Sequence, residues 1–169
     1  MLKAAEVHII HQNVKITLER LQKLRPKSPH CVVMFLGGNL PGKALYHLRV
    51  LSLFGMIARL PESMLNKIAY YQLVHAKPSS DSWFMLVREL CLKYGLPSPL
   101  SLLNMPIPKL QYKRLVKSKV IDFWEKLYRS EASQLNDRSL KYFNPAYMSL
   151  TRSGRPVHQI RMKFTKHNM

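Results

Sequence analysis

The sequence predicts a mostly α-helical protein, an irregular domain of about five to six helices followed by a disordered basic tail. Three observations predict this fold class. Apolar residues recur at intervals of three and four in segment after segment up to Leu135. Prolines and glycines fall between these segments, where helices begin and end. With 169 residues, 47% of them hydrophobic, the chain is long enough for one domain with its own core.

The first helix is expected over residues 4–25, because Pro26 pushes the residue before it out of the helical region. Its polar face includes Glu19 and Lys23, four residues apart, which we expect to pair. Its apolar residues form a seam that could pack on a partner helix. The seam consists of Val7, Ile10, Val14, Thr17, Leu21 and Leu24.

Residues 31–36 suit either a short helix or a strand, and the Ser28-Pro29 pair before them favours a helix. Gly37 and Gly38 then predict a chain-reversing turn, since glycine adopts positive φ at little cost. A helix from Pro41 to about residue 60 follows. It is apolar on nearly every side, which is typical of a central helix that others surround.

Pro61 and Glu62 are expected to open the next helix, whose inward side would hold Met64, Leu65, Ile68, Tyr71 and Leu73. A turn with a helix cap is predicted at residues 78–81. The helix after it should end at Gly95. Its inward face would consist of Trp83, Phe84, Leu86, Val87, Leu90 and Cys91.

Four prolines make residues 96–108 a connector with at most a short turn of helix at 98–103. The longest periodic segment, 108–135, predicts the last long helix. Residues 138–150 are expected to form a short aromatic-rich segment. We expect one domain over 4–150 and a disordered basic tail over 151–169. The inward stripe of the long helix would consist of Tyr112, Val116, Val120, Phe123, Trp124 and Leu127.

Charge is the strongest functional signal in the sequence. Lys and Arg number 27 against 9 Asp and Glu, a formal net charge of +18. Such an excess repels itself unless a polyanion offsets it, so nucleic acid is the first partner to expect and an anionic membrane the second. No acidic residue occurs between Glu19 and Glu62 or between Glu89 and Asp122. The candidate nucleic-acid contacts are Arg20, Lys23, Lys43, Arg49, Lys109, Lys113, Arg114, Lys117, Lys119, Lys141 and Tyr142.

Catalytic and metal-binding patterns are weak by comparison. His8 and His11 are three residues apart, but no further ligands stand at the spacing of a zinc site. Cys31 and Cys91 show no paired spacing, which favours buried thiols in a reducing, intracellular compartment, nuclear or cytoplasmic. No segment is apolar for long enough to cross a bilayer. We therefore expect no cofactor, no metal and no membrane partner.

Several motifs resemble one family. A Gly-Gly-x-Leu-Pro-Gly-x-Ala-Leu turn at 37–45 leads into Leu-Ser-Leu-Phe-Gly-Met-Ile at 51–57, and further similar stretches lie at 77–80, 82–84, 94–97, 115–120 and 147–151. Together they resemble the segment that follows the reverse-transcriptase palm in polyproteins of certain invertebrate non-LTR retrotransposons. The likeness ends at Thr151. The tryptophan-containing run and the Cys- and His-rich knuckle region that follow in such polyproteins are not present in this sequence.

The resemblance implies a helical thumb with an extension that grips the template-primer duplex and the element RNA. It also implies that the catalytic aspartates belong to the absent palm, so this truncated fragment would not be an enzyme by itself. We therefore expect sequence-tolerant nucleic-acid binding by a non-catalytic fragment. The alternatives are a helical protein-interaction or assembly module, docking a helix on its first seam, and a decayed fragment with no independent role.

Overall fold

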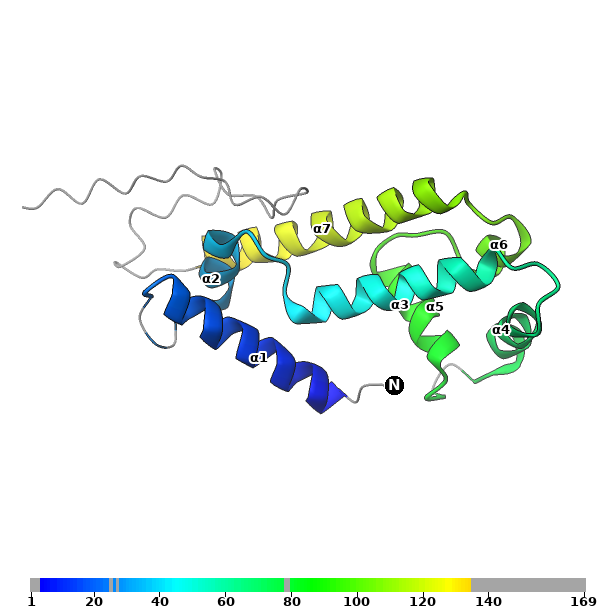
Figure 1. Ribbon diagram of the computed structural model, residues 1–169, viewed down its shortest axis with the longest axis horizontal. Helices are drawn as coiled ribbons and strands as arrows, with labels where there is room; N and C mark the ends of the chain where they lie inside the picture. Colours follow the sequence, from blue (N-terminus) through cyan, green and yellow to red (C-terminus); the bar gives the residue numbers. More distant parts are fainter. Residues whose placement is uncertain (1–3, 25, 27, 78–79, 135–169) are drawn as a thin grey trace, which may run out of the picture.

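The computed structural model describes residues 4–24, 26, 28–77 and 80–134. These residues form seven α-helices and no strand, so the mostly α-helical fold class is confirmed (Figure 1). The segment that suited helix or strand is a helix. The helices are α1 (Ala4–Leu21), α2 (His30–Gly37), α3 (Gly42–Ala58), α4 (Met64–His75), α5 (Trp83–Lys93), α6 (Pro99–Asn104) and α7 (Lys109–Ser133).

Local sequence signals set most of the helix ends. Gly38 follows α2 with φ of 59°, and its N–H donates to the carbonyl oxygen of Phe35, which confirms the predicted turn. The hydroxyl oxygens of Ser63, Ser82 and Ser98 accept from backbone N–H groups in the first turns of α4, α5 and α6. Two expected starts are wrong by a few residues, because these serines, rather than the residues before them, cap α4 and α5.

The core lies between α3 and α7, which run antiparallel through the centre of the molecule (Figure 1). α1 and α2 cover one end of this pair, and α4, α5 and α6 gather at the other. α7 is held by side chains placed every fourth residue, which match the pitch of a helix. These fully or nearly buried side chains are Tyr112, Val116, Val120, Trp124 and Tyr128.

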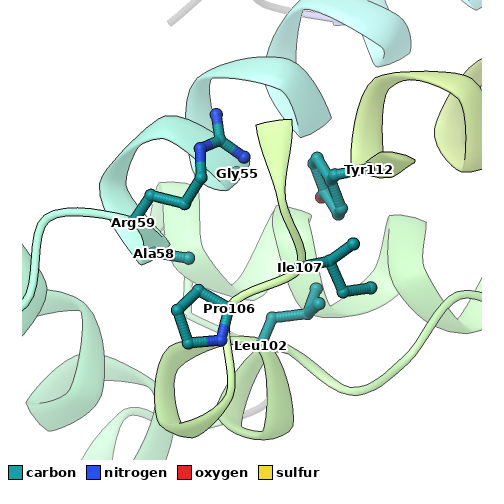
Figure 2. A pocket seen from close by; sticks show the side chains of 7 residues that line it. All are labelled: Gly55, Ala58, Arg59, Leu102, Pro106, Ile107 and Tyr112. Carbon is teal, nitrogen blue, oxygen red and sulfur yellow. The ribbon is translucent and has the colours of Figure 1, made fainter. Parts of the chain in front are cut away.

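A glycine lets α3 and α7 approach closely. The Tyr112 ring lies against Gly55, where a Cβ atom would stand 2.1 Å from the ring's Cε1 atom (Figure 2). The Tyr112 hydroxyl donates to the carbonyl oxygen of Leu51 at 3.2 Å, and the guanidinium carbon of Arg59 lies 6.0 Å from the ring centroid. The hollow beside this ring has no room for a water molecule. The glycine therefore fixes the spacing of the two central helices.

Two predictions are partly wrong: that other helices surround α3, and that the larger apolar residues of α4 face inward. On α3, the side chains of Leu45, Leu53 and Met56 are about half exposed, because no described helix covers that side. On α4, the buried residues are Ala69 and Leu73. The other four apolar residues expected on its inward side are exposed: Met64, Leu65, Ile68 and Tyr71.

The first helix also differs from its prediction. Glu19 pairs with Lys15, at 3.5 Å, rather than with Lys23, because α1 ends at Leu21 and Lys23 follows with φ of 53°. Val14 packs against the core, whereas Leu21, expected in the same seam, is exposed.

Among the described helices, none is both long and apolar enough to cross a membrane. The predicted aromatic-rich segment at 138–150, the domain end at 150 and the basic tail at 151–169 lie outside the described residues.

Candidate nucleic-acid interface

The basic residues of α7 lie on three sides of the helix. Successive residues are about 100° apart around a helix. Lys113 and Lys117 each follow a buried stripe residue by one position and so share one flank, which also carries Lys109. Lys119 precedes Val120 and lies on the opposite flank. Arg114 points away from the core.

One of these sides is a regular row. Lys109, Lys113 and Lys117 are all exposed and follow one another at single helical turns, so they span about 12 Å along α7. No acidic residue occurs in α7 before Asp122. We call these three residues the lysine row. A row of like charges destabilises a helix slightly by itself, so an anion in front of the row would relieve that repulsion.

The two candidates on α3 point in different directions. Lys43 lies in the first turn of α3, one turn before His47. Arg49 lies on the exposed side of α3, between Leu45 and Leu53. The structure therefore brings Lys43, and not Arg49, toward the junction of α3 with α5 and α7.

The two candidates on α1 lie apart from the others. Arg20 lines a groove of about 380 Å³ along the outer side of α1, together with Lys15 and the largely buried Glu19. Lys23 is exposed just beyond the end of the helix. The last two candidates, Lys141 and Tyr142, lie outside the described residues.

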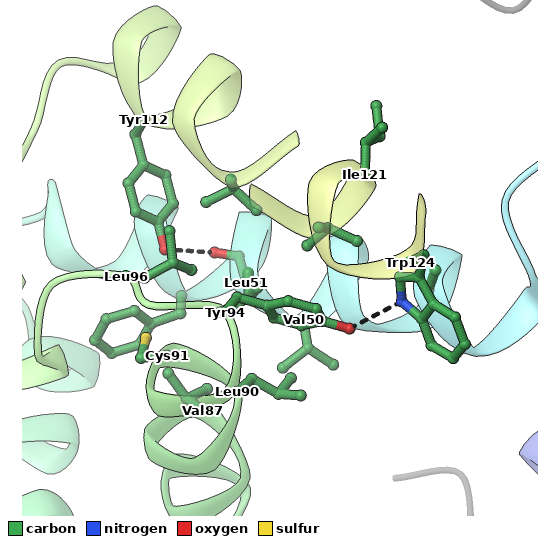
Figure 3. Close-up of a cluster of buried hydrophobic side chains, with 14 of the residues drawn as sticks. Val50, Leu51, Val87, Leu90, Cys91, Tyr94, Leu96, Tyr112, Ile121 and Trp124 are labelled. Carbon is green, nitrogen blue, oxygen red and sulfur yellow. Dashed lines mark hydrogen bonds between the residues drawn. The ribbon is translucent and has the colours of Figure 1, made fainter. Parts of the chain in front are cut away.

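A buried hydrogen-bond network joins α3, the end of α5 and α7. The Trp124 Nε1–H group donates to the Tyr94 hydroxyl oxygen at 3.2 Å (Figure 3), and this hydroxyl lies 2.5 Å from His47 Nδ1. Which of the two atoms donates depends on the tautomer of His47. We assign the proton of a neutral ring to Nε2, so that the Tyr94 hydroxyl accepts from Trp124 and donates to Nδ1.

The surroundings of His47 agree with a neutral ring. Burial, and after it the nearby positive charges of Lys93 and Lys43, together lower the pKa of His47 to about 4. Burial also raises the pKa of Tyr94 to about 12, so this hydroxyl keeps its proton. The network is thus uncharged at neutral pH, and the charge around it comes from the two lysines.

Lys93 belongs to this region, although the sequence analysis did not select it. Its Nζ atom lies 4.8 Å from the ring centroid of Phe123, 5.6 Å from that of Trp124 and 5.7 Å from that of Tyr94. These distances are within the range of cation–π attraction. Burial, and then the charge of Lys43, lower the pKa of Lys93. A lysine directly before a helix-ending Tyr-Gly pair gives no sequence signal of this, since two of its three ring partners, Phe123 and Trp124, come from another helix.

Other chemistry finds little support among the described residues. They contain no group of three or more His, Cys, Asp or Glu side chains that could hold a metal ion. Asp122 accepts from the Ser118 hydroxyl at 3.2 Å, one turn earlier on the same helix, and Asp81 lies in the loop before α5. Cys31 and Cys91 are buried free thiols on separate helices.

Comparison of the sequence with models of known protein families gives no match, and comparisons with curated proteins and with solved structures give none either.

Proposed function

We propose that this chain binds nucleic acid without sequence preference, through phosphate contacts made by basic side chains on its helices. The observation that carries the proposal is the lysine row of α7. Over its length of about 12 Å, a nucleic-acid duplex presents about seven phosphates, since it carries one charge per 1.7 Å of axis. Three evenly spaced ammonium groups on a rigid helix can contact several of these phosphates without reading any base.

The rest of the chain supports the same proposal. The net charge of +18 is far larger than solubility requires. The motifs that resemble a post-palm segment of retrotransposon reverse transcriptases suggest RNA or an RNA–DNA duplex as the partner. On that reading the chain is a non-catalytic part of a polymerase polyprotein, and its site of action is the nucleus or the cytoplasm. Arg114 on the outer side of α7 would add a contact beside the row, whereas Lys119, Arg20, Lys23 and Arg49 lie on other sides and would be reached only by a strand that extends around the molecule.

Mobility-shift titrations of labelled RNA and DNA duplexes at several salt concentrations test this function. Binding should weaken steeply as salt rises, with a slope of about 0.9 per phosphate contacted. The double variant Lys113→Gln with Lys117→Gln should lower that slope by about 2. A matched control removes two exposed lysines far from α7, Lys67→Gln with Lys77→Gln, and should leave the slope unchanged. Absence of any binding at low salt would refute the proposal.

A second candidate function is the helical interaction module, and the outer face of α4 favours it. Met64, Ile68 and Tyr71 are 74%, 41% and 62% exposed and recur at helical spacing, which is the pattern of an anchor helix that docks in a groove. Soluble monomers rarely expose such a continuous apolar strip. Lys67 flanks the strip and α4 contains no acidic residue, so the fitting partner is an apolar surface with an acidic rim.

A direct measurement separates this second function from the first. We expect an amphipathic helical peptide with acidic flanks to bind the chain, and Ile68→Ser to weaken that binding several-fold. A peptide with the same apolar face and basic flanks is the control. Equal binding of both peptides, or of neither, would contradict a charge-matched docking face on α4.

A further inference from the structure

Lys43 and Lys93 are brought together by the buried network, although they are far apart in the sequence. Lys43 lies one turn before His47 on α3, and residues four apart on a helix are neighbours. His47 contacts the Tyr94 hydroxyl, and the Lys93 ammonium lies 5.7 Å from the centroid of the Tyr94 ring. Both lysines therefore lie around the same tyrosine, where α3, α5 and α7 meet.

The position of Lys93 is fixed by its surroundings. Three aromatic rings from two segments lie within 4.8 to 5.7 Å of its ammonium group. Those rings are themselves held in place. Tyr94 packs edge-on against Phe123, with ring centroids 5.2 Å apart, and its hydroxyl accepts from Trp124. The ammonium group is thus held near one position instead of sweeping through solvent as a surface lysine does.

This arrangement places two positive charges side by side without compensation. Within the part of the chain that the structure describes, neither lysine forms an ion pair with a carboxylate. The first turn of α3, which contains Lys43, holds no acidic residue, and Pro41 before it offers no side-chain acceptor. Burial, and after it the charge of Lys43, lower the pKa of Lys93, and His47 stays neutral beside the pair. An anion between the two ammonium groups would remove this cost.

We propose that Lys43 and Lys93 together bind one phosphate group of the nucleic-acid backbone. This inference rests on the proposed function and adds a specific anchor to it. The lysine row supplies contacts along an exposed flank, whereas this pair comes from two helices and only its Lys93 lies over a group of aromatic rings. A phosphodiester offers two unesterified oxygens, one for each ammonium group, so a single backbone phosphate matches the pair. The pair would therefore fix the position of the strand on the protein.

Fluorescence anisotropy of the full chain with labelled RNA and DNA, as duplexes and single strands, tests this site at several salt concentrations. Lys43→Gln and Lys93→Gln should each weaken binding by about threefold to tenfold at moderate salt. If both lysines share one phosphate, the double variant should lower the salt slope by about 0.9 on duplexes, and not by twice that amount. Lys77→Gln in the loop after α4, which removes the same charge from an exposed position, should stay within twofold of wild type.

Two further variants keep the test decisive. Lys93→Arg retains both the charge and the cation–π contact, so it should retain binding. Thermal unfolding followed by circular dichroism shows whether Lys93→Gln still folds. If Lys93→Gln does not fold, the affinities of Lys43→Gln, which changes an exposed residue, and of Lys93→Arg are compared with that of the wild type instead. A separate titration with inorganic phosphate shows whether the pair binds a free phosphate instead.

The outcomes distinguish this inference from the function beneath it. Loss of affinity in both variants with an unchanged Lys77→Gln control supports the site. If the wild type binds nucleic acid and neither Lys43→Gln nor Lys93→Gln weakens that binding, the site is refuted and the proposed function stands. A third outcome is that inorganic phosphate binds saturably and requires both lysines, while neither substitution changes the affinity for nucleic acid. This outcome assigns the pair to a small phosphate ligand and also refutes the proposal. Absence of nucleic-acid binding by the wild type refutes both.

Discussion

Acidification should destabilise this fold through His47, and the structure gives the size of the effect. The imidazole is buried, accepts from the Tyr94 hydroxyl on Nδ1, and lies near the charges of Lys43 and Lys93. Its pKa of about 4 in the folded chain is lower than the ordinary 6.5. The unfolded chain therefore takes up this proton first. Stability that is fully present above about pH 6.5 is lost as the pH falls toward 4.

The magnitude follows from the two pKa values. A pKa of about 4 when folded and 6.5 when unfolded predicts a loss of about 0.7 kcal/mol on going from pH 7 to pH 6, and about 2 kcal/mol on going to pH 5. The groups that face the ring are Lys43 on the same helix, Lys93 and Tyr94 at the end of α5, and Trp124 on α7.

The assay is urea unfolding at pH 7, 6 and 5, followed by circular dichroism, for the wild type and for His47→Gln. Glutamine keeps an acceptor for the Tyr94 hydroxyl but cannot gain a proton in this range. General acid destabilisation through the large positive charge affects both proteins equally and cancels in the comparison. The wild type should lose about 2 kcal/mol more than the variant by pH 5. Parallel pH profiles for the two proteins would show that His47 is not buried as a neutral ring.

Three further predictions concern the core. Gly55→Ala should destabilise the fold by about 1 to 3 kcal/mol in urea unfolding, because the added Cβ would overlap the ring packed against it, whereas Ser52→Ala on the exposed side should change stability by less than about 0.5 kcal/mol. Tyr94→Phe should cost about 2 kcal/mol or more, since it leaves a buried indole donor and a buried imidazole acceptor unpaired; a loss near zero would contradict the network. Burial raises the pKa of Cys91 to about 12, and it also raises the pKa of Cys31. Both thiols should therefore react with Ellman's reagent only after urea unfolds the chain, and fast reaction of the native protein would contradict their burial.

The helices could be predicted because their signals are local. Gly38, with its positive φ, stops α2 through contacts within five residues, and Ser98 caps α6 at the short turn predicted over 98–103. The starts of α4 and α5 were missed by a few residues, although Ser63 and Ser82 cap these helices by equally local contacts. Periodicity alone also identified most of the inward stripe of α7. Such patterns need no knowledge of the tertiary arrangement, so a single sequence contains them.

The inward side of α4 could not be predicted in the same way. Periodicity shows which face of a helix is apolar, but a face is buried only if another element covers it. On α4 the side that packs is marked by the small Ala69 and by Leu73, while the larger apolar residues point outward. The sequence rule assumes that the most apolar face turns inward. A face built to meet a partner violates that assumption, which is why the discrepancy supports the interaction-module function.

The lysine pair could not be predicted for a different reason. Lys43, Lys93 and Phe123 belong to three segments separated by tens of residues, and each is unremarkable among its neighbours in the chain. Only the packing of α3, α5 and α7 brings their side chains to one tyrosine. Lys43 and Lys93 both stand in acid-free stretches, so charge counting alone could not mark Lys93 as different from the other basic residues there.

The two candidate functions occupy different helices, and this separation makes them independent in experiments. The lysine row and the lysine pair lie on α7 and at the α3–α5 junction, whereas the exposed apolar strip lies on α4 at one end of the molecule (Figure 1). Salt weakens phosphate contacts and leaves apolar docking nearly unchanged. If both functions exist, Ile68→Ser should alter peptide binding alone and Lys113→Gln nucleic-acid binding alone. If Ile68→Ser instead lowers the affinity for nucleic acid, the strip belongs to the nucleic-acid interface, and the separate docking face on α4 must be abandoned.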